Sequence, residues 1–258
     1  MCVGWLLQQQ GLGDVWGYQE SYYSWVSGVT DNALYPGLIW SMIQPLINAT
    51  LDSNSSFFPP PDDDDTVFED GILTWGGLFV VFVKMLLSVL MVMPNFFIVG
   101  NIDKVLMAAA VVTVVPYLVF SGMCVPYIEW SNYAEYNLTL PNFSAMMQNL
   151  FWNLNGFDSI STAAGEVINP TVTISTALWI TIPLVVVVLF LPLAAAAGVN
   201  RPVPWQNWQE GQFSVIAAYV GSGGGLAIAI SIAAAVGGWG LYVTEMMEDS
   251  FQIHGMVR

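Results

Sequence analysis

Four ionisable residues lie inside apolar stretches of this chain: Glu20, Asp31, Lys84 and Asp158. Charged side chains are costly at membrane depth, and those that occur there commonly mark a solute or ion pathway. Glu20, Asp31 and Asp158 are therefore candidates for a functional role. For Lys84, an ion pair with a buried carboxylate is the simpler explanation than substrate binding.

A run of polar residues interrupts the most polar of these stretches. It contains Asn153, Asn155, Gly156 and Asp158 within six residues. A continuous lipid-facing helix does not carry such a run, whereas a broken helix does, because its unwound backbone lines a polar cavity. Carbonyl oxygens, a carboxylate and an aromatic face can together hold an ammonium group there. A kinked helix that faces its neighbours is the alternative.

A second polar pattern lies in the first apolar stretch, where six residues recur at intervals of three or four. They are Glu20, Ser24, Ser27, Gly28, Asp31 and Tyr35. This spacing places them on one face of a helix. The face can line a solute path or can pack small residues against another helix. Both interpretations stay open for the stripe, and the first is favoured for Asp31.

The elements that must position these residues are transmembrane helices. The 258 residues are 55% hydrophobic and 9% charged, and an ordinary soluble domain carries about 25% charged residues. We therefore predict an all-α, polytopic transmembrane helix bundle that forms a single domain over residues 1–258, with the bilayer as its solvent. Six spans are expected, at about residues 15–47, 72–94, 103–123, 146–168, 176–197 and 213–244.

The net charge of −15, with four Lys and Arg, excludes nucleic acid as a partner.

The loops predict the orientation of the chain. Residues 48–71 form an acidic loop and residues 124–145 a second loop on the same side. The four N-glycosylation acceptors, which share the Asn-X-Ser/Thr pattern, are Asn48, Asn54, Asn137 and Asn142. All four fall in these two loops, so both loops are expected to face the extracellular side and both chain ends the cytoplasm. The plasma membrane is the favoured location, and an endomembrane is the alternative.

Several kinds of chemistry have no motif in this sequence. It contains no catalytic triad, metal-ligand cluster or nucleotide-binding motif, so we expect neither an enzyme nor a cofactor or metal. Gly221 to Gly225 lack the Lys-Ser/Thr of a phosphate loop, and close helix packing is expected of them. Whether Cys2 and Cys124 are free or bridged stays open.

Three ordered segments resemble a known family. Residues 149–170, which include Asn153 to Asp158, resemble the broken sixth helix of the amino acid–polyamine–organocation superfamily. Residues 16–36 resemble its third helix, and residues 240–256 the inner end of its eighth. The likeness is to the polyamine uptake and L-amino-acid transporter branch of plants and protists. It implies a partial LeuT-like fold with two inverted repeats, in which this chain is a fragment that covers helices three to eight.

The resemblance also implies roles for individual residues. The positions that match the family's substrate site are Ser27, Gly28, Asn32, Trp152, Asn155, Gly156, Phe157, Asp158 and Trp239. Among these, Trp152 matches an aromatic gate and Asp158 an acid implicated in proton coupling.

The activity implied is secondary active transport of a small cationic amine or an amino acid, coupled to protons by symport or exchange. A non-transporting membrane subunit or inactive fragment is the alternative, and an accessory membrane subunit stays unidentified. An ion channel is a third class, although the sequence contains no filter motif.

Overall fold

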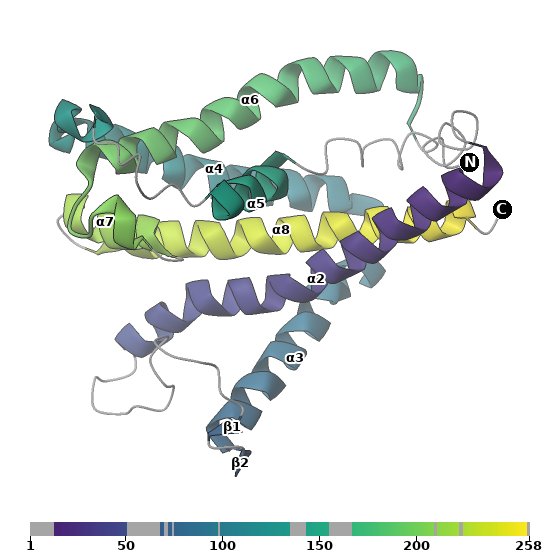
Figure 1. Ribbon diagram of the computed structural model, residues 1–258, viewed down its shortest axis with the longest axis horizontal. Helices are drawn as coiled ribbons and strands as arrows, with labels where there is room; N and C mark the ends of the chain where they lie inside the picture. The colour runs from purple at the N-terminus through teal and green to yellow at the C-terminus, as the bar shows by residue number, and fades with distance from the viewer. Residues whose placement is uncertain are drawn as a thin grey trace. The chain divides into compact units, whose positions relative to one another are not determined.

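The described part of the chain is mostly helical (Figure 1). The computed structural model describes residues 13–50, 68–69, 72–73, 75–97, 99–134, 143–154, 167–208, 211–221 and 224–256. Its helices are α2 (Asp14–Thr50), α3 (Trp75–Phe97), α4 (Ile102–Cys124), α5 (Phe143–Leu154), α6 (Pro170–Val199), α7 (Gln212–Val220) and α8 (Gly225–Met256). The prediction of an all-α, polytopic architecture is confirmed.

Short elements join these helices. Strand β1 (Phe68–Glu69) pairs antiparallel with β2 (Ile72–Leu73), and Phe68 lies opposite Leu73. The 3-10 turns are η1 (Val99–Asn101), η2 (Val125–Tyr127), η3 (Trp130–Ala134) and η5 (Trp205–Asn207). Helix α6 starts with Pro170, whose missing N–H is tolerated at the first helical position.

Four helices in the described part of the chain are long and apolar enough to cross a membrane. They span Leu78–Phe96, Ile102–Tyr127, Pro170–Val199 and Gly225–His254. Helix α2 has 37 residues, which is about 55 Å of helix at 1.5 Å per residue. It is therefore long enough to span a bilayer, although the polar residues Glu20, Asp31 and Asn32 lower its hydropathy.

The described helices differ from the six expected spans at two places. The start of the span expected at residues 72–94 contains strand β2, and α3 begins only at Trp75. The span expected at residues 213–244 contains two helices, α7 and α8, rather than one. The break has a backbone cause, because Gly221 is extended and Gly224 has a φ of 69°, which glycine adopts without a steric cost.

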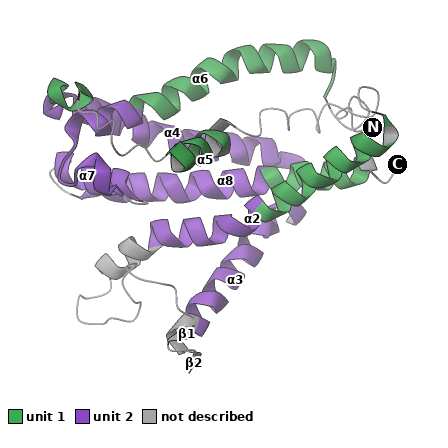
Figure 2. Cartoon of the chain, viewed as in Figure 1, with its two compact units in different colours: residues 1–30, 129–191, 245–258 green, residues 31–128, 192–244 purple. Residues whose placement is uncertain are grey.

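The chain divides into two compact units, coloured separately in Figure 2. Unit 1 comprises residues 1–30, 129–191 and 245–258, and unit 2 comprises residues 31–128 and 192–244. The apolar core of unit 2 is made by α4, the end of α6, α7 and the start of α8. Its buried members are Phe120, Cys124, Ala195, Ala196, Val199, Ile216, Ala217, Val220 and Ile230.

Aromatic edges extend this core. The ring of Phe213 meets Tyr117 at 5.7 Å and Phe120 at 5.8 Å between centroids, both edge to face. Such pairs add to the energy of apolar burial. Small residues of α6, such as Ala196 at 0% exposure, let the helices approach closely. This packing fixes α4 and α8 in unit 2.

Candidate substrate site

Helices α2 and α8 contact each other in unit 1 through polar groups. The Nε2 of Gln252 donates a hydrogen bond of 3.0 Å to the backbone carbonyl of Ser21, and Ser21 is 1% exposed. One helical turn nearer the start of α8, the carboxylate of Asp249 occupies the space in which Gly28 would carry a Cβ. Gly28 therefore lets a charged side chain lie against the backbone of α2.

The same two helices contact each other in unit 2 through apolar and aromatic groups. The rings of Tyr35 and Tyr242 meet edge to face, with 6.1 Å between centroids and 75° between planes. Next along the helices, Gly238 accommodates Ile39, whose Cγ1 lies 3.2 Å from the position of an added Cβ. Tyr35, Ile39 and Tyr242 are all buried.

The contact residues have a regular spacing along each helix. On α2, Ser21, Gly28 and Tyr35 are seven residues apart, and Ile39 follows after four. On α8, Tyr242 and Asp249 are likewise seven apart. Intervals of seven, divided into threes and fours, are typical of helices that pack along a narrow seam. We call these α2 and α8 contact residues the α2–α8 seam.

Helix α8 also packs against α4 in unit 2. The Oγ1 of Thr113 donates a hydrogen bond of 3.3 Å to the carbonyl of Ala233. A Cβ added at Gly237 would lie 2.9 Å from the Cγ2 of Thr113. Gly237 and Gly238 therefore serve two different neighbours, which explains why two adjacent glycines are needed.

Two of the residues expected at a substrate site lie on these helices in unit 2. Asn32 is 8% exposed, and its Oδ1 is buried. Pro36, one turn further on, has no N–H with which to form the helical hydrogen bond to the Asn32 carbonyl. Trp239 is half-buried on α8, next to Gly238. Asn32 is thus a buried polar residue on α2, close in sequence to the apolar contacts of unit 2.

The polar stripe predicted on α2 does not coincide with the packed face. Glu20, Ser24 and Ser27 are exposed, and Asp31 is half-buried. Of the stripe, only Gly28 and Tyr35 belong to the seam. The interpretation of the exposed members as lining a solute path remains a prediction.

The residues of the predicted helix break are largely outside the described part of the chain. Helix α5 is described to Leu154, and the side chain of Trp152 is not described. Asn155, Gly156, Phe157 and Asp158 lie outside the described residues. Their roles therefore stay predictions.

The other predicted positions also fall partly inside and partly outside the described residues. Asn48 lies in the last turn of α2 without a described side chain, and Asn54, Asn137, Asn142 and Cys2 lie outside the described residues. Cys124 is a free, buried thiol in the core of unit 2. In the described part of the chain, no group of three or more His, Cys, Asp and Glu side chains could hold a metal ion.

Sequence reasoning missed the seam residues Ser21, Tyr242, Asp249 and Gln252. The seven-residue spacing of the α2 contacts Ser21, Gly28 and Tyr35 is visible in the sequence. It was obscured by the more conspicuous stripe that begins one residue earlier, at Glu20. The partner positions on α8 lie more than 200 residues away, so their pairing is a tertiary fact.

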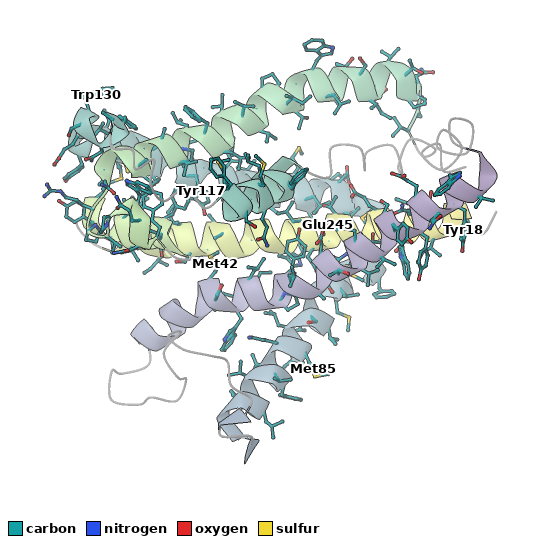
Figure 3. The ribbon with its side chains drawn as sticks, viewed as in Figure 1. Tyr18, Met42, Met85, Tyr117, Trp130 and Glu245 are labelled. Carbon is teal, nitrogen blue, oxygen red and sulfur yellow. The ribbon has the colours of Figure 1, made fainter. Side chains whose placement is uncertain are left out.

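Three acidic side chains lie near the end of α8, where the helix contacts α2 in unit 1. Glu245, Glu248 and Asp249 are half-buried there, and the Oε2 of Glu245 is buried. Figure 3 marks Glu245 on this helix. Carboxylates within a helix of transmembrane length are suited to bind cations or protons. Fold and side chains together define an integral, multi-pass membrane protein that carries acidic groups within its spans.

Comparison with known proteins identifies relatives of this class. The chain is 32% identical over 248 residues to a probable polyamine transporter of Arabidopsis thaliana, which covers 95% of this chain and 44% of the relative. It is 31% identical over 245 residues to polyamine transporter PUT1 of Oryza sativa subsp. japonica, covering 95% and 41%. It is 31% identical over 247 residues to polyamine transporter RMV1 of A. thaliana, covering 95% and 45%. No family model and no solved structure matches.

These relatives confirm the resemblance that the sequence indicated. The chain is homologous, along nearly all its length, to proteins named polyamine transporters. It spans less than half the length of these curated relatives.

Proposed function

We propose that this chain forms central helices of a secondary transporter for polyamines, with amino acids as the related substrate class. The observation that carries the proposal is the homology over 95% of the chain to proteins named polyamine transporters. The acidic end of α8 and the scarcity of Lys and Arg, of which the chain has four, support a cationic solute. The protein is proposed to move solute rather than to catalyse a reaction on it.

In this proposal the residues that match the family's substrate site bind the solute. In unit 2 these are Asn32 and Trp239. In the ranges of unit 1 they are Ser27, Gly28, Trp152, Asn155, Gly156 and Phe157.

Proton coupling is the second part of the proposal. Asp158 carries the coupling charge, and Asp31 and Glu20 are further proton carriers. The physical argument is that these carboxylates lie within predicted spans, where a change in protonation alters the energy of binding a cation.

The alternative is a membrane subunit or inactive piece that does not transport by itself. Of two uptake measurements, the first sets the baseline for the chain alone and the second separates the two functions. In liposomes with an inward-directed spermidine gradient, we expect the purified chain alone to accumulate no radiolabelled spermidine. A chimera in which this chain replaces the aligned segment of polyamine transporter PUT1 should restore spermidine uptake to yeast that lack their own uptake. A correctly localised chimera without uptake would favour the non-transporting subunit.

A further inference from the structure

An apolar groove of about 500 Å³ lies in unit 2 between α3 and α8. Its lining residues are Ser88, Val89, Val92, Met93, Phe96 and Tyr242. Five of the six come from one face of α3, at the three- and four-residue intervals of a helix. The groove is therefore a feature of the second half of α3, closed on one side by the Tyr242 ring.

The groove has almost no polar group to offer a ligand. The Oγ of Ser88 donates a hydrogen bond of 2.8 Å to the carbonyl of Lys84, within the same helix. The ring of Tyr242 packs on Tyr35. A groove with this lining favours an apolar occupant, because a polar group buried there would lack a hydrogen-bond partner.

The groove also lies at the depth of lipid tails. Both of its helices are of transmembrane length and hydropathy, over Leu78–Phe96 and Gly225–His254. From Ser88 to Phe96 is about 12 Å of helix, which is close to the roughly 15 Å of one leaflet of a 30 Å hydrocarbon core. Ser88 falls near the middle of the span and Phe96 at its end. One acyl chain, entering at Phe96, matches this length.

Two opposite charges follow the groove along the chain, in the first turn of the next helix. Helix α4 begins at Ile102, after the short turn η1, so its first turn follows closely on the end of α3. Asp103 and Lys104 are both exposed there. The Nζ of Lys104 donates a hydrogen bond of 3.0 Å to Asn101 Oδ1, and an ammonium has two further donors.

We propose that the groove binds one zwitterionic phospholipid with an ethanolamine headgroup. Its acyl chain fills the space between α3 and Tyr242, Lys104 donates to its phosphate, and Asp103 accepts from its ammonium. A pair of adjacent, opposite charges complements a zwitterionic headgroup better than an anionic one, because Asp103 repels added negative charge.

The test measures lipid retention by the full chain. Native mass spectrometry of the chain in detergent, titrated with phosphatidylethanolamine or phosphatidylglycerol of matched tails, should show one phosphatidylethanolamine bound at least fivefold more tightly. Val92→Trp fills the groove and should abolish this preferential binding. Leu90→Trp, at an exposed position of α3 outside the groove, should leave it intact.

Charge variants test the headgroup contacts separately from the groove. Asp103→Asn should reduce the preference for phosphatidylethanolamine over phosphatidylglycerol, and Lys104→Ala should weaken the binding of both lipids. Equal retention of the two lipids by the unaltered chain would overturn the headgroup assignment. Equal effects of Val92→Trp and Leu90→Trp, or a dimer that forms in place of the lipid complex, would overturn the groove as a lipid site.

A second measurement avoids any variant that fails to fold. Phosphatidylethanolamine should raise the Tm of the unaltered chain in detergent by several degrees more than phosphatidylglycerol does, because a ligand of the folded state stabilises it. An equal or smaller rise would contradict the proposal.

Discussion

Helices α2 and α8 pass through both compact units, and their contacts differ between the two. In unit 1 the contacts are polar: Gln252 bonds to the Ser21 carbonyl, and the Asp249 carboxylate lies against Gly28. In unit 2 they are aromatic and aliphatic, with Tyr35 on Tyr242. One pair of helices therefore uses two kinds of packing at the same seven-residue spacing.

The basic residues follow the same division. Lys84, Lys104 and Arg201 fall in unit 2, and the only Lys or Arg in the ranges of unit 1 is Arg258. The acidic residues do not: Asp158, Glu245 and Asp249 fall in the ranges of unit 1, and Asp31 falls in unit 2. The difference teaches that the polar contacts between α2 and α8 belong to unit 1, whereas unit 2 has the apolar core that a scaffold requires.

The largest effect is expected from Asp158→Asn, which removes the proposed coupling charge from the ranges of unit 1. In the chimera with polyamine transporter PUT1, this change should abolish pH-dependent spermidine uptake, because asparagine cannot exchange a proton. Uptake measured from pH 5 to pH 8 checks it. Glu166→Gln, the same loss of charge eight residues later, is the control and should keep the pH dependence. If uptake by the Asp158→Asn chimera still depends on pH, Asp158 is not the coupling group.

The next largest effect is expected from Gly237→Leu in unit 2. Its Cβ would lie 2.9 Å from Thr113, so α4 and α8 must separate and the Thr113 hydrogen bond to Ala233 is strained. Overpacking of this kind costs about 1–3 kcal/mol. The matched control is Gly240→Leu, since an added Cβ at Gly240 has no neighbour within 4 Å. Thermal melting in detergent should show a lower Tm for Gly237→Leu alone, and an equal loss at Gly240 would argue against the tight α4–α8 contact.

Much of the fold could be predicted from the sequence because hydropathy governs it. The long apolar stretches over Leu78–Phe96 and Pro170–Val199 can satisfy their backbone in a bilayer only as helices. The division between α7 and α8 could not be predicted with the same certainty. A glycine run both permits close packing and ends helices, and the positive φ of Gly224 selects the second outcome.

The candidate site was less predictable than the fold. A helical stripe such as Glu20 to Tyr35 shows that one face of α2 is polar, but not which residues contact another helix. The seam shares only Gly28 and Tyr35 with that stripe and otherwise uses Ser21 and Ile39. Pairing with Asp249 depends on the path of a chain more than 200 residues long, which local spacing does not encode.

A smaller effect is expected from Gly28→Ala in unit 1. The new methyl group would overlap the Asp249 carboxylate, so that side chain must move, at a cost of about 1–2 kcal/mol. The control is Gly37→Ala on the same helix, where an added Cβ meets nothing within 4 Å. There the substitution should stabilise the chain by up to about 1 kcal/mol.

A second variant shows whether space or charge matters at this contact. Adding Asp249→Ala to Gly28→Ala should recover the Tm, because the shorter side chain leaves room for the methyl group. Asp249→Asn, with nearly the same shape, should not recover it. If Asp249→Asn, combined with Gly28→Ala, also recovers the Tm, then charge rather than space governs the polar contact of unit 1.

The smallest effect is expected from Gln252→Leu, which removes the hydrogen bond to the Ser21 carbonyl but keeps an apolar side chain of similar size. Hydrogen bonds between transmembrane helices are worth about 0.6 kcal/mol on average, so the Tm should fall only slightly. Gln19→Leu is the control, since Gln19 bonds to Tyr23 on an exposed face of its own helix and should leave the Tm unchanged. A loss at Gln252 as large as that of Gly237→Leu would mean that unit 1 is held by its polar contacts as firmly as unit 2 is held by its core. The difference between the polar contacts of unit 1 and the apolar core of unit 2 would then be one of chemistry and not of stability.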